Sequence, residues 1–107
     1  MVFHSFQNNY HDSRIYGIHV GPRREVTLDV LLDSVWNKGG PSVAKLRFGG
    51  VVNYPEVSAF FLRIPEPSEG KAVEEIIGIK KIGKRSWIVD LCPAGAITIE
   101  CAHMDET

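Results

Sequence analysis

His11 and Asp12 are adjacent in the stretch NNYHDSR, and an imidazole beside a carboxylate could hold a metal ion or orient a catalytic base. Neighbouring residues of a strand point to opposite faces, so the pair shares one metal only if residues 8–13 form a turn. A metal site needs three or four ligands, and the chain has no H-x-H, H-E-x-x-H or C-x-x-C spacing. We therefore expect Asp12 or Ser13 to cap a turn and His11 to donate to a nearby backbone carbonyl, with no cofactor.

The elements that must position these groups are mainly strands, because apolar and polar residues alternate along most of the chain. The expected strands cover residues 14–21, 25–33, 43–48, 57–64, 72–82, 86–92 and 96–102. The 72–82 segment is ambiguous, since its first half could form a helical turn, but an internal glycine weakens a helix there. The sequence predicts one all-β domain over residues 1–107. We expect an antiparallel meander of about six or seven strands, forming a sandwich or open barrel with at most one short helix.

The register of the first two strands follows from matching their apolar faces, because a slip of one residue inverts the sheet. The favoured pairs are Val20 with Val26, Ile18 with Leu28 and Tyr16 with Val30. This register places His19 opposite Thr27 and diagonal to Asp29 on the polar face. A His-Asp pair there could orient a base, although a solvated cross-strand pair is the stronger expectation.

The two cysteines belong to the last expected hairpin, whose turn contains Pro93-Ala94-Gly95. The expected pairs are Cys92 with Ala96, Leu91 with Ile97, Val89 with Ile99 and Trp87 with Cys101. At roughly 3.3 Å per residue this register separates the cysteines by about 16 Å. A disulfide needs Cα atoms within about 7 Å, so we predict free thiols, with Cys101 in the core.

Charge and composition exclude several classes of partner. The formal net charge is −1, and a cluster of basic residues from Lys80 to Arg85 is more typical of a solvated strand edge than of a nucleic-acid site. No apolar run approaches the roughly 18 residues of a membrane span. The first residues lack the basic start and apolar middle of a signal peptide, so we expect a cytoplasmic protein that binds neither membranes nor specific nucleic acids.

Apolar residues fall on both faces of two expected strands, which a single solvated layer does not require. Leu31 and Phe61 are the residues in excess. Either a loop or short helix covers them, or they form a protein interface, including that of a homodimer. Asp12, Glu25, Asp29 and Asp33 could face a basic partner, with His19 as a further candidate for the same surface.

The chain resembles a loose group of small bacterial β-proteins, mostly uncharacterised, some of which look like immunity proteins of polymorphic-toxin systems. The resemblance lies in the opening His11-Asp12-Ser13, in the middle segment LRFGGVV, and in the closing WIVDL and AITIECAHMDE strands. The chain departs from the group in its glycine pair and in AVEEIIGIKKI. The resemblance implies a β fold and a binding role rather than an established chemistry.

Three functions follow, in order of preference. The first is a non-catalytic protein-binding module, such as an immunity protein that occludes a toxin's active site, which needs a complementary surface rather than catalytic groups. The second is an oligomeric barrel that binds a small ligand in its mouth. The third is a metal-dependent enzyme using His11 and Asp12, although no nucleophile, base and orienting group come together in the sequence.

Overall fold

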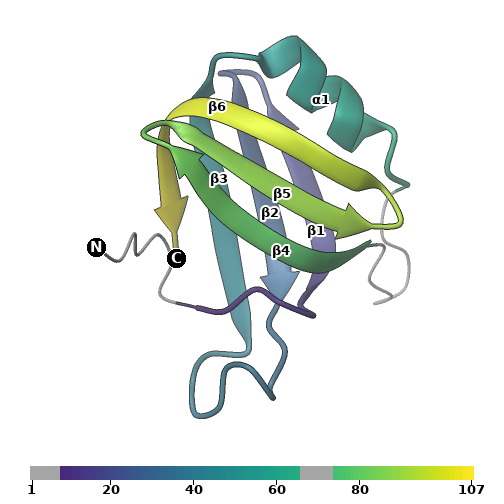
Figure 1. The fold of residues 1–107 in the computed structure, drawn as a ribbon. Helices are drawn as coiled ribbons and strands as arrows, with labels where there is room; N and C mark the ends of the chain where they lie inside the picture. Colours follow the sequence, from purple (N-terminus) through teal and green to yellow (C-terminus); the bar gives the residue numbers. More distant parts are fainter. Residues whose placement is uncertain (1–7, 66–73) are drawn as a thin grey trace.

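A computed structural model describes residues 8–65 and 74–107, which form six strands and one helix. The strands are β1 (Arg14–Gly21), β2 (Glu25–Leu31), β3 (Val43–Val51), β4 (Glu74–Gly83), β5 (Ser86–Cys92) and β6 (Gly95–Glu106), and the helix is α1 (Tyr54–Leu62). All pairings are antiparallel, and the strand order β1-β2-β3-β6-β5-β4 closes into a barrel (Figure 1). The all-β antiparallel fold with one short helix is confirmed.

Closure depends on a short seam between the first and fourth strands. Only Arg14 and Ile15 of β1 pair with β4, opposite Glu75 and Glu74. The long β6 bends around the barrel, pairing with β5 in its first half and with β3 from Cys101 onward (Figure 1). The β1–β4 and β3–β6 pairings join strands that are far apart in the sequence. The alternation within single strands does not reveal such pairings, so the sequence was compatible with both a sandwich and an open barrel.

The expected register of β1 and β2 is confirmed for Val20 with Val26 and for Ile18 with Leu28. The pairing of Tyr16 with Val30 is wrong, because a bulge between Ile15 and Gly17 shifts the register and Ile15 takes that place. The side chain of Ile15 is therefore buried, and Tyr16 is 43% exposed. A bulge inserts one residue on one strand and so exchanges the faces on either side of it.

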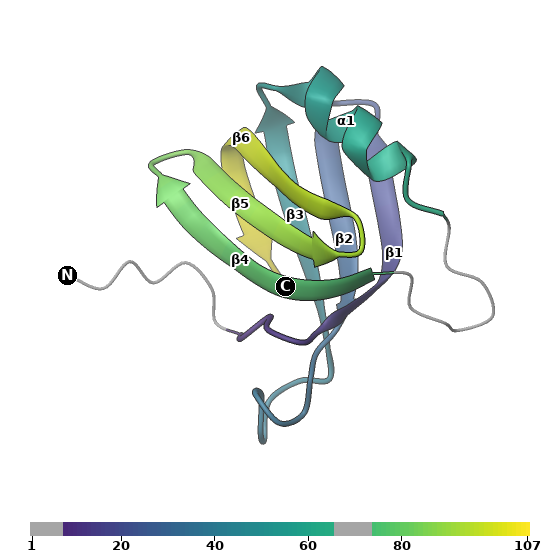
Figure 2. The ribbon, with the colours of Figure 1, turned by 45° about the vertical axis from the view of Figure 1, so that its right-hand side comes forward.

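Residues 57–64 were expected as a strand, and that prediction is wrong. The structure has α1 from Tyr54 to Leu62, with Pro55 in its first turn, where the missing N–H breaks no helical hydrogen bond. Val57, Phe60 and Phe61 are buried at the i, i+3, i+4 spacing of one helical face. The helix packs across β1 and β6 at one end of the barrel (Figure 2).

The segment with AVEEIIGIKKI is a strand over its described part, Glu74–Gly83, as predicted; residues 72 and 73 lie outside the described ranges. The β5–β6 hairpin has a register two residues from the expected one, since Leu91 pairs with Gly95 and Val89 with Ile97. A shift of two keeps every side chain on its face, so the buried set is unchanged. Cys92 is exposed and Cys101 is buried, and both are free thiols, as expected.

The barrel interior is filled by apolar side chains from every strand and from α1. The largest fully buried ones include Phe48, Phe61, Leu28 and Ile99. The Phe48 and Trp87 rings meet edge to face, with centroids 6.2 Å apart. Within the described ranges, every helix is too short or too polar to cross a membrane.

Candidate functional site: an exposed tryptophan held by the His-Asp turn

His11 and Asp12 lie in the turn that leads into β1. The Nδ1 of His11 donates to the carbonyl oxygen of Ile77 at 2.7 Å, which confirms the expected role of this histidine. The predicted cap is wrong, because the side-chain oxygen of Asn9 accepts from the His11 backbone N–H at 3.0 Å. Asp12 has a φ of 63°, a left-handed conformation that aspartate tolerates better than most residues. The Oδ1 of Asp12 lies 3.5 Å from His11 Nε2, and its Oδ2 has a second partner.

That partner is Trp36, which lies in the loop between β2 and β3. The indole Nε1–H of Trp36 donates to Asp12 Oδ2 at 3.0 Å. The His11 and Trp36 rings meet edge to face with centroids 5.1 Å apart. Trp36 is nevertheless 48% exposed. Two side chains of the His-Asp turn thus hold a large aromatic ring in place at the surface.

Ser13 and Asp33 fasten the loop that carries Trp36. The buried Ser13 hydroxyl accepts from the Asp33 backbone N–H at 3.3 Å. Asp33 Oδ1 in turn accepts from the backbone N–H of Val35 at 2.8 Å, which caps the turn before the tryptophan. Asn9 and Asn37 complete the connection, since the Asn9 N–H donates to Asn37 Oδ1 and the Asn37 amide donates back to the Asn9 carbonyl.

Exposed apolar residues surround this framework. Val35 is 67% exposed, and Ile77, whose carbonyl accepts from His11, is 41% exposed. Leu31 and Val43 are cross-strand partners at the base of the same loop, and each is about half exposed. We call this set the Trp36 surface; it consists of His11, Leu31, Val35, Trp36, Val43 and Ile77.

His19 and Asp29 form the predicted cross-strand pair, with His19 Nε2 and Asp29 Oδ2 2.9 Å apart. Lys45 Nζ lies 3.6 Å from the other oxygen of the same carboxylate. Gly17 makes room for this arrangement, because a Cβ at that position would lie 2.5 Å from Asp29 Oδ2. The Asp29 side chain is only 15% exposed and lies between the His19 imidazole and the Lys45 ammonium, so its carboxylate is engaged within the protein.

Phe61 does not belong to the surface, which corrects the sequence-based interface of Leu31 with Phe61. Its side chain is 1% exposed and packs edge to face on Phe60, with ring centroids 5.2 Å apart. The apolar residues on both sides of segment 57–64 are explained by helix α1, whose buried face includes Phe61. Leu31 remains exposed and is retained as a candidate.

The remaining titratable candidates are dispersed. Arg47 binds Asp105 at 2.7 Å, and this hydrogen bond lowers the pKa of the Asp105 carboxyl below its ordinary value. Burial, followed by the hydrogen bond to Glu106, raises the pKa of Tyr10. Within residues 8–65 and 74–107, histidine, cysteine and acidic side chains form no group of three or more that could hold a metal ion. The metal-site hypothesis therefore gains no support from the described residues, and His4 lies outside them.

Sequence reasoning selected five of the residues that build this site, namely His11, Asp12, Ser13, Leu31 and Asp33, and missed Trp36. The available signal was a tryptophan in a polar, glycine-rich connection, SVWNKGGPS, where an aromatic residue has no strand to bury it. Comparisons of this chain with family models, with curated proteins and with solved structures find no match.

Proposed function

We propose that this protein is a non-catalytic protein-binding module and that the Trp36 surface is its contact with the partner. The observation that carries the proposal is an exposed tryptophan restrained by both a hydrogen bond and a ring contact. Tryptophan is among the residues most enriched at the energetic centres of protein interfaces. An anchor already held in one orientation loses less conformational entropy on binding.

The sequence suggested three aspartates as contacts for a basic partner, but in the structure they form bonds within the protein. Asp12 accepts from Trp36, Asp33 caps the loop, and Asp29 lies between His19 and Lys45. Because these carboxylates already have partners within the protein, we propose that the exposed Trp36 side chain makes the main contact with the partner. We accordingly expect a partner with an apolar pocket that receives the indole.

The kind of partner is proposed from the resemblance to immunity proteins. Such a protein inhibits an enzyme by covering its active site, and this task requires surface complementarity alone. The alternative is a small ligand in the mouth of the barrel, since the core side chains that fill the interior leave no room for it deeper inside. Self-association through Leu31 stays a prediction, to be checked by sedimentation of the purified chain.

The test is capture of partners by the tagged chain at moderate salt, compared with two variants. Trp36→Ala removes the anchor, and Leu62→Ala is the matched control, because Leu62 is a 71% exposed apolar residue on α1. We expect one stoichiometric partner with the wild type and with Leu62→Ala, and none with Trp36→Ala.

Calorimetry with the purified partner then measures the loss. Removing a central aromatic anchor weakens binding by about 2 kcal/mol or more, which is roughly a thirtyfold change in Kd. Equal affinity of wild type and Trp36→Ala for the partner would refute the Trp36 surface as the contact.

A further inference from the structure

The fourth strand has a backbone edge that the described residues leave open. β1 pairs only with Glu74 and Glu75, and the backbone of Ile76 exchanges hydrogen bonds with Ser13 and Asp12. From Gly78 to Gly83 the strand pairs with β5 on one side, and no other described segment pairs with its second side. Figure 1 shows β4 as the outer strand along this part of the barrel. Such an edge presents backbone donors and acceptors to an incoming chain.

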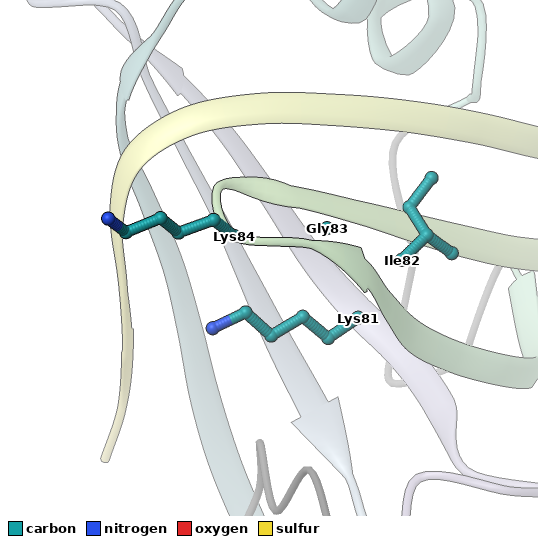
Figure 3. Close-up of a pocket in the computed structure, with 4 residues that line it drawn as sticks. All are labelled: Lys81, Ile82, Gly83 and Lys84. Atoms are coloured by element: carbon teal, nitrogen blue, oxygen red, sulfur yellow. The ribbon is translucent and has the colours of Figure 1, made fainter.

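This edge is positively charged. Lys80, Lys81, Lys84 and Arg85 are all exposed. Among the ion pairs formed between described residues, none includes any of these four cations. The ammonium of Lys81 lies 5.1 Å from the centre of the Trp87 ring, and the side chains of Lys81 and Lys84 extend to the same side of the hairpin (Figure 3). An anionic segment beside β4 would meet these charges.

Exposed apolar side chains lie on either side of Lys80 and Lys81. Ile77 and Ile82 are 41% and 53% exposed, at the two ends of the open edge. A cavity of about 420 Å³ is lined by Lys81, Ile82, Gly83 and Lys84 (Figure 3). Its wall combines an aliphatic side chain, the methylene stems of two lysines and a glycine, so it suits an apolar side chain next to an acidic one.

A second copy of this chain does not suit the edge. Two β4 strands placed edge to edge would bring the lysines of both copies together, and like charges on paired strands are destabilising. Bulges between Ile76 and Gly78 and between Lys81 and Gly83 leave a regular ladder from Gly78 to Lys81, which bounds the length of any added strand. Lysines on an edge strand discourage self-pairing, and their charge makes an acidic partner the favoured occupant.

We propose that the open edge of β4, residues Gly78–Gly83, receives an extended segment of a partner protein in which acidic and apolar residues alternate. The segment adds a strand beside β4, its carboxylates lie on the face of Lys81 and Lys84, and its apolar side chains lie on the opposite face, one of them at the cavity wall formed by Ile82. The inference rests on the proposed function in that the occupant belongs to a protein partner. The bond between His11 and Ile77 joins this edge to the Trp36 surface, so one partner can contact both.

The test uses the full chain, labelled for NMR, and a synthetic peptide in which Glu and Val alternate. Two control peptides have Lys in place of Glu, or one central proline that cannot donate to a ladder. The protein variants are Lys81→Glu combined with Lys84→Glu, the charge-reversal control Arg23→Glu in the exposed turn between β1 and β2, and Trp36→Ala.

We expect the Glu-Val peptide to shift and protect the amide signals of residues 78–83. Binding should weaken about tenfold or more with the double lysine variant and with either control peptide, and stay unchanged with Arg23→Glu. Absence of binding, shifts outside β4, or equal binding of the proline peptide would overturn the inference.

The Trp36→Ala variant separates the two proposals. It should bind the Glu-Val peptide as the wild type does, while losing the native partner. If the Glu-Val peptide does not bind the wild type while partner capture still depends on Trp36, the proposal for the β4 edge is rejected and the Trp36 surface stands. If the peptide binds at β4 while partner capture does not depend on Trp36, the Trp36 surface is rejected and the proposal for the β4 edge stands.

Discussion

The carboxylate of Asp12 accepts a hydrogen bond from the indole of Trp36 at 3.0 Å, across 24 positions in the sequence. This contact gives the His-Asp pair a structural role, since both of its side chains hold one aromatic ring at the surface. In the structure the pair contacts an exposed tryptophan.

The first prediction concerns this contact. Asp12→Gly removes the acceptor while tolerating the φ of 63°, so Trp36 becomes more mobile and the free energy of unfolding falls by no more than about 1 kcal/mol. Acrylamide quenching of tryptophan fluorescence measures the change, because Trp87 is buried and Trp36 dominates the response. Asp12→Asn retains a side-chain oxygen acceptor and serves as the control. Identical quenching of all three proteins would show that Asp12 does not restrain the ring.

The second prediction places Phe61 in the core. Phe61→Ala leaves a cavity under α1 and should reduce the free energy of unfolding by about 3 to 5 kcal/mol, measured by urea denaturation. Its neighbour Leu62 is 71% exposed, so Leu62→Ala should change stability by no more than about 0.5 kcal/mol. A stable Phe61→Ala variant with a changed oligomeric state would restore Phe61 as an interface residue.

The third prediction compares two glycines within strands. Gly50 has a φ of +61°, and a Cβ there would lie 2.9 Å from the Cβ of Ala102, so Gly50→Ala should destabilise the fold by about 1 to 3 kcal/mol. Gly78 has open space around its missing Cβ, and Gly78→Ala should stay within about 0.5 kcal/mol of wild type. Thermal unfolding of both variants provides the measurement, and equal losses would contradict the strain at Gly50.

The fourth prediction concerns the thiols. Burial raises the pKa of Cys101 from 9.0 to about 11, so its thiol is both covered and neutral near pH 8. A disulfide reagent should modify one thiol in the native protein, Cys92, and two after denaturation in urea. The variant Cys92→Ser should show no rapid reaction in its native state. Fast modification of two thiols without urea would contradict the burial of Cys101.

The raised pKa of Cys101 makes the free energy of unfolding depend on pH. An acid with a raised pKa in the folded state loses its proton first in the unfolded chain, which therefore gains stability relative to the fold as pH rises. The contribution of Cys101 is complete below its ordinary pKa of 9.0 and is lost between there and about pH 11. Urea denaturation across this range should show a steeper loss of stability for wild type than for Cys101→Ala.

The sequence by itself determined the features that depend on local alternation. It predicted the all-β class, the β1–β2 register near the turn, the strand character of the described part of β4 and the free cysteines. It also predicted the hydrogen bond that His11 donates, because a histidine at the start of a strand lies close to backbone carbonyls. Alternation identifies which side chains share a face, and the fold class and the strand register follow from it.

The tertiary structure decided which elements pack against each apolar face. Segment 57–64 carries apolar residues at both strand and helix spacings, so only its packing on β1 and β6 made it a helix and buried Phe61. The candidate site joins Asp12 to Trp36 across 24 positions of the sequence, and His11 to Ile77 across 66. Contacts at such separations arise from the closure of the barrel, which brings the segment before β1 between the β2–β3 loop and β4, and no local pattern encodes them.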